Sequence, residues 1–408
     1  MPPACLVAAG RRAATPGNGL VSTPMSDRAP TAGHHLACCP GPNAWARAGV
    51  ARGRGSGMAD HTLPTRHADE NRPVRIVTDI LPALRDACPV PSRQSPYADE
   101  VQRWLMGWLP QTGLPLDEPA RQRLAGARFA HYAGRLYPDA TEADLRVLSA
   151  LFTWFFLVDD ACDGPGRLEL AEIRGLRDGA VLLLQGRSRP RHPGLRGPLR
   201  RLLVNAWREP HRRMPTRWRL RFADAVARHL DGTWQEATNK SRGHAPGVTE
   251  YVALRRATSA ADVSYPLAEF VTGRPLPDAV YHHPLLRELR DLGNDLLSWY
   301  NDLASLASDA ATSGGHNLVL ATATERQVRV DDAVEVVTRR WHESMRRFVD
   351  RRAAVPSFGP ALDAAVTTHL DGVSRAVRGT IDWTLESTRY VGKEGHLINA
   401  SGSKGAPS

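Results

Sequence analysis

The stretch FFLVDDACDG, residues 155–164, places three carboxylates within five positions directly behind a run of large apolar residues. On a helix, Phe156, Asp159 and Asp163 follow one another at intervals of three and four residues, so they share one face. Asp160 lies about 100° round the helix from Asp159. Acidic side chains at the C-terminal end of a helix are disfavoured by the helix dipole. The cluster therefore has no ready explanation in helix stability.

Carboxylates gathered at one helix end repel one another unless a cation neutralises them. Mg²⁺ commonly takes one or two carboxylates, keeps several waters and completes its shell with phosphate oxygens of a substrate. The alternative is a solvated acidic helix end. Because short strings rich in aspartate arise often by chance, a metal site needs further ligands elsewhere in the chain.

A second candidate group lies in DLGNDLLSWYNDLAS, residues 291–305. Here Asn294, Ser298 and Asp302 recur at intervals of four and line one helix face. An amide, a hydroxyl and a carboxylate in this spacing could chelate a second divalent ion. The alternative is the polar surface stripe of an ordinary amphipathic helix.

From about residue 89 onward, apolar residues recur with helical periods broken by short stretches rich in Pro and Gly. This pattern predicts an all-α fold, a single large helical bundle surrounding a central active-site cavity. The predicted helices cover residues 97–107, 118–136, 142–160, 168–184, 197–208, 217–238, 249–264, 285–311, 328–353 and 361–387.

The composition divides the chain into three parts. Residues 1–57 contain six arginines but one acidic residue, and are rich in Ala, Gly and Pro. Such a segment cannot bury enough apolar surface to offset its conformational entropy. We expect residues 1–88 to be a disordered extension, partly upstream of a true start at Met25 or Met58, with an organellar transit peptide as the alternative. The domain then covers residues 89–395, and residues 396–408 form a flexible tail.

The charge of +10 and the pI near 9.8 raise the hypothesis of a basic, nucleic-acid-binding helical protein. Such a protein should carry a basic stripe on its folded domain, whereas half of the surplus lies in residues 1–57. The cysteines outside that segment, Cys88 and Cys162, form neither a zinc motif nor a disulfide framework. No apolar run reaches the roughly 18 residues of a membrane span. We expect a cytoplasmic protein that binds neither nucleic acid nor membrane.

Together the two acidic stretches resemble the DDxxD and NDxxSxxxE motifs of bacterial class I terpene synthases. Three further stretches match the same family: YVALRRATSA at 251–260, HNLV at 316–319 and DWTLESTRY at 382–390. The motifs occur in the family's order, and the resemblance spans roughly residues 89–395. Two positions depart from the pattern, with Asp302 where Glu is usual and Asn301 where Lys is common.

The resemblance implies roles for individual residues. Three Mg²⁺ ions, with Mn²⁺ as an alternative, would be held by Asp159, Asp160, Asp163, Asn294, Ser298 and Asp302. The diphosphate would be bound by Arg256, with Arg255 as the alternative, and by Arg389 and Tyr390. Ser259 and Ala260 would be the linker and effector positions of a helix break. Aromatic faces stabilise a cation without attacking it, which makes Phe155, Phe156, Trp299 and Trp383 candidates for the cavity wall, although core packing is the alternative for each.

The implied activity is the Mg²⁺-dependent ionisation and cyclisation of a linear isoprenoid diphosphate by a lyase that is a monomer or a homodimer. Farnesyl diphosphate, converted to a sesquiterpene with release of diphosphate, is the expected substrate. The alternatives are a monoterpene or diterpene synthase, a chain-elongating prenyl transferase and the nucleic-acid-binding protein. Because prenyl transferases resemble a pattern with two aspartate-rich motifs, the stretch NDLLSWYND favours a synthase.

Overall fold

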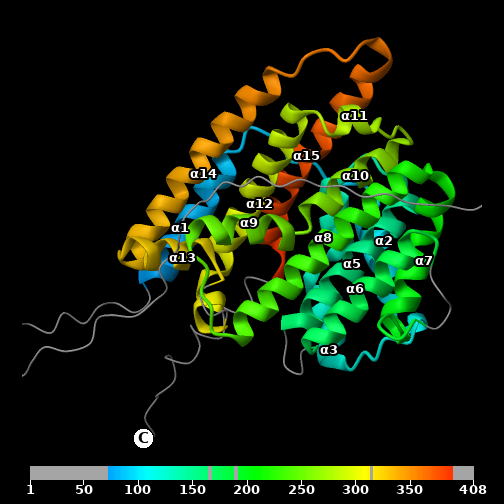
Figure 1. Ribbon diagram of the computed structural model, residues 1–408, viewed down its shortest axis with the longest axis horizontal. Coiled ribbons are helices and arrows are strands. Elements are labelled where there is room, and N and C mark those ends of the chain that lie inside the picture. The colour runs from blue at the N-terminus through cyan, green and yellow to red at the C-terminus, as the bar shows by residue number, and fades with distance from the viewer. Residues whose placement is uncertain (1–71, 164–167, 188–191, 313–315, 389–408) are drawn as a thin grey trace, which may run out of the picture. The chain divides into compact units, whose positions relative to one another are not determined.

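The computed structural model describes residues 72–163, 168–187, 192–312 and 316–388, which lie within one helical unit (Figure 1). Over these residues the chain forms helices and no strand. The predicted all-α fold is confirmed. The ordered elements are α1 (Arg72–Ala87), α2 (Ala98–Trp108), η1 (Leu109–Thr112), α3 (Glu118–Ala127), α4 (Phe129–Leu136), α5 (Glu142–Asp163), α6 (Leu170–Leu184), α7 (Gly197–Arg213), α8 (Thr216–Ser241), α9 (Val248–Thr258), α10 (Ala261–Thr272), α11 (Asp278–Tyr281), α12 (Pro284–Thr312), α13 (Leu318–Arg326), α14 (Val330–Ala353) and α15 (Pro360–Glu386).

Two predicted helices are each divided in two. The helix expected over 118–136 is α3 and α4, separated at Arg128, and the helix expected over 249–264 is interrupted at Ala260, between α9 and α10. Both residues have a positive φ, 51° for Arg128 and 58° for Ala260. This left-handed conformation is uncommon for residues other than glycine, so composition alone did not mark either break.

Helix α1 lies inside the segment that was expected to be disordered up to residue 88, so that prediction is wrong for residues 72–87. The helix packs against α12 and α14, and its side chains of Leu81 and Leu84 are buried. Tertiary packing of a short apolar stripe stabilises a helix that propensity alone does not predict. Residues 1–71 and 389–408 lie outside the described residues.

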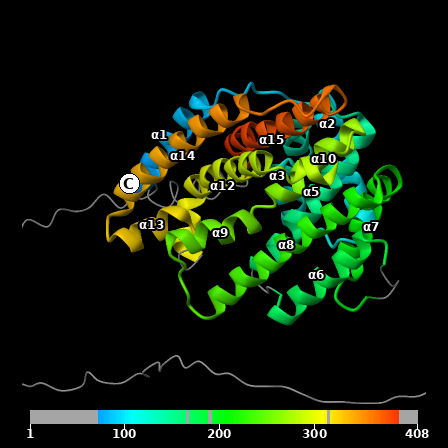
Figure 2. The same cartoon turned by 45° about the horizontal axis from the view of Figure 1, so that its top comes forward.

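Six helices pack in a closed ring. Along this ring α5 contacts α8, α8 contacts α9, α9 contacts α12, α12 contacts α15, α15 contacts α4, and α4 returns to α5. Figures 1 and 2 show α1, α13 and α14 on one side of the ring, and α6 and α7 on the other. A closed ring of helices is the arrangement expected for a bundle built around a central site.

Among the described helices, none is both long enough and apolar enough to cross a bilayer.

Candidate active site

The first acidic motif lies at the C-terminal end of α5. This helix begins where the hydroxyl of Thr141 accepts a hydrogen bond from the backbone N–H of Asp144 at 3.2 Å, which satisfies one of the free donors of the first turn. Asp159 is half-buried and Asp160 is exposed. Asp163 is the last residue of α5, and its side chain lies outside the described residues.

The second motif lies on α12, where Asn294, Ser298 and Asp302 are all buried. The hydroxyl of Ser298 donates to Oδ1 of Asn294 at 3.0 Å. The hydroxyl of Ser259 donates to the same Oδ1 at 2.7 Å. The helix spacing and the break between α9 and α10 thus bring three side-chain oxygens into one small polar group.

The break itself is held open by its neighbours. Helix α9 ends at Thr258, Ser259 caps it, and α10 begins at Ala261. A helix end leaves backbone carbonyls without intrahelical partners. Here Asn294 Nδ2 donates to the carbonyl of Arg256 at 2.8 Å, and His229 Nδ1 lies 3.3 Å from the carbonyl of Ala257. Side chains from α12 and α8 therefore replace the hydrogen bonds that the break removes.

His229 was not recognised from the sequence. It is a single buried histidine in the apolar face of α8, a pattern more typical of core packing. Because a carbonyl only accepts, the contact with Ala257 places the ring proton on Nδ1. Burial lowers the pKa of His229 to about 4, so the ring is neutral at pH 7. The ring also lies edge-on to Phe155, with 5.6 Å between the centroids.

These contacts relate the two motifs in space. Phe155 lies one helical turn before Asp159, and it contacts His229. His229 contacts Ala257, whose neighbour Arg256 is bound through its carbonyl by Asn294. The acidic end of α5 and the polar stripe of α12 are therefore linked through α8 and the helix break.

The two arginines of the YVALRRATSA stretch are bound by different carboxylates. Arg256 donates from Nε and Nη2 to the two oxygens of Asp295, both at 2.7 Å, and this pairing raises the pKa of Arg256. Arg255 donates from Nε to Asp302 Oδ1 at 3.0 Å. Asp302 Oδ2 accepts from the hydroxyl of Tyr251 at 2.7 Å.

Phe156 and Trp383 of the predicted wall are brought together from α5 and α15. Their ring centroids lie 5.4 Å apart. Two rings of α4 complete the group: Phe129 stacks on Phe156 at 4.4 Å, and Tyr132 stacks on Trp383 at 4.4 Å. Neither ring of α4 was predicted from the sequence, because only their positions on a neighbouring helix relate them to Phe156.

Trp299 was predicted to line the cavity wall, but it lies apart from the Phe156 cluster. The guanidinium of Arg340 lies over its ring at 4.6 Å, on the side of α12 that faces α14. Trp299 also lines a hollow of about 830 Å³ together with Arg256, Asp295 and Arg340. This hollow is bounded by α9, α12 and α14 and does not include the Phe156 cluster among its lining residues.

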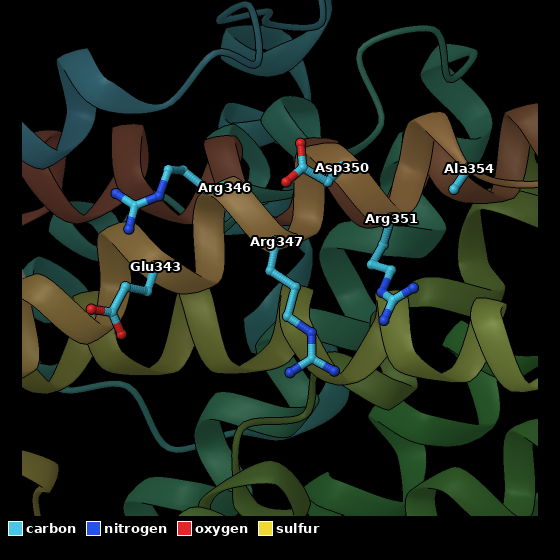
Figure 3. Close-up of a pocket in the computed structure, with 6 residues that line it drawn as sticks. All are labelled: Glu343, Arg346, Arg347, Asp350, Arg351 and Ala354. Carbon is cyan, nitrogen blue, oxygen red and sulfur yellow. The ribbon is translucent and has the colours of Figure 1, made fainter.

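A second hollow of about 580 Å³ lies along α14 and is lined by Glu343, Arg346, Arg347, Asp350, Arg351 and Ala354 (Figure 3). Figure 3 shows Arg347 and Arg351 pointing towards α12, where both pair with Glu288. Since its lining comes from one helix and is largely charged, we interpret it as a solvated surface rather than as the site of an apolar substrate.

The donor set of α12 suits a hard cation. Asn294 and Ser298 offer neutral oxygens side by side, and rotation of the hydroxyl groups away from Asn294 Oδ1 would turn lone pairs towards an ion. Among the described side chains, no three of the types His, Cys, Asp and Glu gather closely enough to hold an ion by themselves. Arg389 and Tyr390, predicted to bind diphosphate, lie outside the described residues.

Comparisons with known proteins point in one direction. A family model described as terpene synthase family 2, C-terminal metal binding, matches residues 150–347. Germacrene A synthase of Nostoc punctiforme is 25% identical over 74% of this chain and 93% of its own length. The (+)-T-muurolol synthase of Roseiflexus castenholzii, named as cyclising (2E,6E)-farnesyl diphosphate, is 28% identical over 73% of this chain and 90% of its own.

Solved structures agree. A point variant of cucumene synthase superposes with a TM-score of 0.66 at 27% identity, covering 74% of this chain and 99% of that one. The linalool/nerolidol synthase of Streptomyces clavuligerus superposes with a TM-score of 0.65 at 26% identity, covering 73% and 99%.

Proposed function

Because this chain belongs to the class I terpene synthase family, lyases that act on isoprenoid diphosphates, we propose that it cyclises farnesyl diphosphate to a sesquiterpene in the presence of Mg²⁺ and releases diphosphate. The observation that carries the proposal is the polar group formed by Ser259, Asn294 and Ser298 at the break between α9 and α10. In this proposal a cation and the diphosphate would be held at this group.

The choice of substrate rests on the relatives. The muurolol synthase is named for farnesyl diphosphate, and other similar proteins are named pristinol synthase and sesquiterpene synthase Agr1. A chain of this family that matches sesquiterpene synthases over about three quarters of its length is best assigned the same substrate class. Geranyl and geranylgeranyl diphosphate are the alternatives.

The family is described as metal binding, so the activity involves a divalent metal. We propose that this metal is Mg²⁺, bound by Asn294 and Ser298 on α12 and by Asp159, with Asp160 and Asp163, on α5. The bound ions would neutralise the charge that develops on the leaving diphosphate.

The chain's own residues have three tasks in this proposal. Arg256 would donate to diphosphate oxygens, with its guanidinium oriented by the bidentate contact with Asp295. Arg389 and Tyr390 would add donors from the end of the chain. The rings of Phe156 and Trp383 would exclude water and face the allylic cation with their π-systems, which carry no attacking lone pair.

The proposal is tested by incubating the protein with Mg²⁺ and, separately, geranyl, farnesyl and geranylgeranyl diphosphate. Volatile products are identified by gas chromatography with mass spectrometry, and released diphosphate is quantified. We expect cyclic C15 products with farnesyl diphosphate. Cyclic C10 or C20 products would replace the substrate assignment, and elongated diphosphates would indicate a prenyl transferase. No turnover of any of the three, together with tight DNA binding, would contradict the proposal as a whole.

We further propose that the enzyme acts in the cytoplasm as a monomer or homodimer. Cell fractionation and light scattering of the purified protein test these two points. Recovery with membranes, or a mass above that of a dimer, would contradict them.

A further inference from the structure

Asp302 is the third residue of the predicted metal stripe, yet its carboxylate is already bound on both oxygens by protein donors. Oδ1 accepts from Nε of Arg255 at 3.0 Å. Oδ2 accepts from the hydroxyl of Tyr251 at 2.7 Å and from the backbone N–H of Leu318 at 3.2 Å. Asp302 itself is 2% exposed. A carboxylate in this environment has few lone pairs left for a cation.

The donors around Asp302 come from two other helices. Tyr251 and Arg255 lie one turn apart on α9, and Leu318 is the first residue of α13. Asn317, which caps α13, also donates to the backbone carbonyl of Asp302 at 2.7 Å. A single residue of α12 therefore joins α9 and the start of α13.

The neighbouring Asn301 completes the site for Arg255. Its Oδ1 accepts from Nη2 of Arg255 at 2.8 Å, next to the contact between Nε and Asp302. A lysine at 301 would instead bring a positive charge against the guanidinium. The two residues that depart from the family pattern, Asn301 and Asp302, thus together bind the guanidinium of Arg255.

Asn294 and Ser298 have a different environment. Oδ1 of Asn294 accepts from the rotatable hydroxyls of Ser259 and Ser298, which are neutral donors. Moving Asp302 to an ion would leave the largely buried guanidinium of Arg255, whose side chain is 20% exposed, without its carboxylate, which is unfavourable. The two hydroxyls can rotate away from Asn294 without such a loss.

We infer that Asp302 is an anchor and not a metal ligand in this protein: it fixes Arg255 and Tyr251 of α9 and the start of α13, while the ion on α12 is held by Asn294 and Ser298. This inference rests on the proposed function, since it assigns the metal ligands of that same site. It predicts that substitutions at 302 and at 298 affect different measurable properties.

The first measurement is the melting temperature without metal. Asp302→Asn removes the charge that pairs with Arg255 and should lower the melting temperature by roughly 5 °C or more. Tyr251→Phe removes one donor and should lower it by less. Ser298→Ala should leave it nearly unchanged. Equal melting temperatures for Asp302→Asn, Tyr251→Phe and the wild type would overturn the anchoring role.

The second measurement is calorimetric binding of inorganic diphosphate with Mg²⁺, below the melting temperature of each variant. Ser298→Ala should weaken binding about tenfold or more, whereas Asp302→Asn should stay within about threefold of the wild type. A loss in Asp302→Asn as large as that in Ser298→Ala would overturn the inference.

Tyr251→Phe provides a check that does not depend on the folding of Asp302→Asn. If Asp302 were a ligand, removing one of the two donors to its Oδ2 should strengthen Mg²⁺ binding; an anchor leaves the affinity unchanged. Should the wild type itself fail to bind diphosphate with Mg²⁺, the proposed function would be contradicted, while the melting temperatures would still decide whether Asp302 anchors α9.

Discussion

Asn294 occupies the centre of the polar group at the helix break, because its amide serves both parts of it. Oδ1 accepts from two serine hydroxyls, and Nδ2 donates to the carbonyl of Arg256. An alanine at this position removes the oxygen and leaves that carbonyl with only the longer contact from the hydroxyl of Ser259, at 3.4 Å. Asn294 is therefore both a proposed metal ligand and a residue that stabilises the break between α9 and α10.

Replacing the proposed ligands should act on turnover. We expect Asn294→Ala and Asp159→Ala each to lower kcat by roughly 100-fold or more, since each removes an interaction aimed at the charge that develops in the transition state. Steady-state kinetics with farnesyl diphosphate measures this. Asp350→Asn, an exposed acid on α14, is the matched control. Near-normal kcat in either ligand variant would show that the metal site is misplaced.

His229 makes stability dependent on pH. Its folded pKa of about 4 lies below the ordinary value of 6.5, so the unfolded chain binds more protons between these pH values. The contribution is complete above pH 6.5 and is lost as the pH falls towards 4, by an amount on the order of 3 kcal/mol.

His229→Gln should remove most of this dependence, because glutamine can donate to the carbonyl of Ala257 but does not titrate in this range. Urea unfolding of wild type and variant at about pH 7 and about pH 4.5 measures the difference. His211→Gln, at an exposed position, is the control. An acid-induced loss of stability that is the same in all three proteins would contradict the assignment.

At the level of the helices, the break between α9 and α10 is the element that positions the site. Ala260 holds φ at +58°, a conformation that is unfavourable by about 1–2 kcal/mol for residues other than glycine. This strain is offset by the hydrogen bond that Ser259 Oγ accepts from the backbone N–H of Ala261, and by the contacts of Asn294 and His229 with the carbonyls at the end of α9. The break is thus determined by neighbouring helices rather than by its own sequence.

Substitution of Ala260 tests this account. Ala260→Val should destabilise the fold by more than about 1 kcal/mol, since a β-branched side chain is a severe outlier at positive φ. Ala260→Gly relieves the strain and should be neutral or slightly stabilising. Thermal unfolding of both variants gives the comparison. If valine and glycine had the same effect, the strain at Ala260 would not be real.

Helices with a regular apolar repeat were predicted well. Helices whose ends depend on contacts with other helices were predicted poorly. The periods of α5, α8, α12, α14 and α15 located these helices to within three residues at each end. The breaks at Arg128 and Ala260 carry no Gly or Pro, so periodicity ran straight through both, although the family resemblance did imply a helix break at Ser259 and Ala260. Helix α1 carries an apolar stripe that includes Ile80, Leu81 and Leu84, but it follows the arginine-rich segment and was included in the expected disorder.

Across the molecule, a buried ionic group outside the two metal motifs joins several helices. Arg221 of α8 donates to Glu269 of α10 at 2.6 Å, and Nδ1 of His369 in α15 lies 3.1 Å from the same carboxylate. The guanidinium groups of Arg221 and Arg290 each lie 4.0 Å from the ring centroid of Tyr281. This group holds α8, α10 and α15 together with α12.

Glu269→Gln should therefore be strongly destabilising, by about 3–5 kcal/mol, because it leaves the buried Arg221 with only the more exposed Asp278 as a charge partner. Chemical unfolding at pH 7 measures the loss. Glu288→Gln, which removes the more exposed pairs with Arg347 and Arg351, should change stability by about 0–1 kcal/mol. A Glu269→Gln variant as stable as Glu288→Gln would contradict a structural role for the buried group.

In the candidate site, too, spacing within one helix could be read from the sequence, whereas contacts between helices could not. Spacing along one helix predicted that Asn294 and Ser298 share a face, which their hydrogen bond confirms, whereas their role as metal ligands stays a prediction. The same spacing places Phe156 on the face of Asp159. Spacing along one helix cannot predict contacts between helices. For this reason the contacts of His229 with Phe155, of Phe129 with Phe156 and of Tyr132 with Trp383 were not predicted. The placement of Trp299 against Arg340 was missed for the same reason.

Helix α15 is the last member of the ring to leave the ribosome. It fills the place between α12 and α4, and Tyr132 and Thr380 hydrogen-bond at 3.1 Å across 248 positions of the chain. Domains form contacts of such long range late, because the chain between them must first be closed into a loop. The nascent chain therefore already carries both acidic motifs when Trp383, the last ring of the aromatic cluster, has not yet been added. Until that helix emerges, the apolar faces of α4 and α12 remain open to other chains and chaperones.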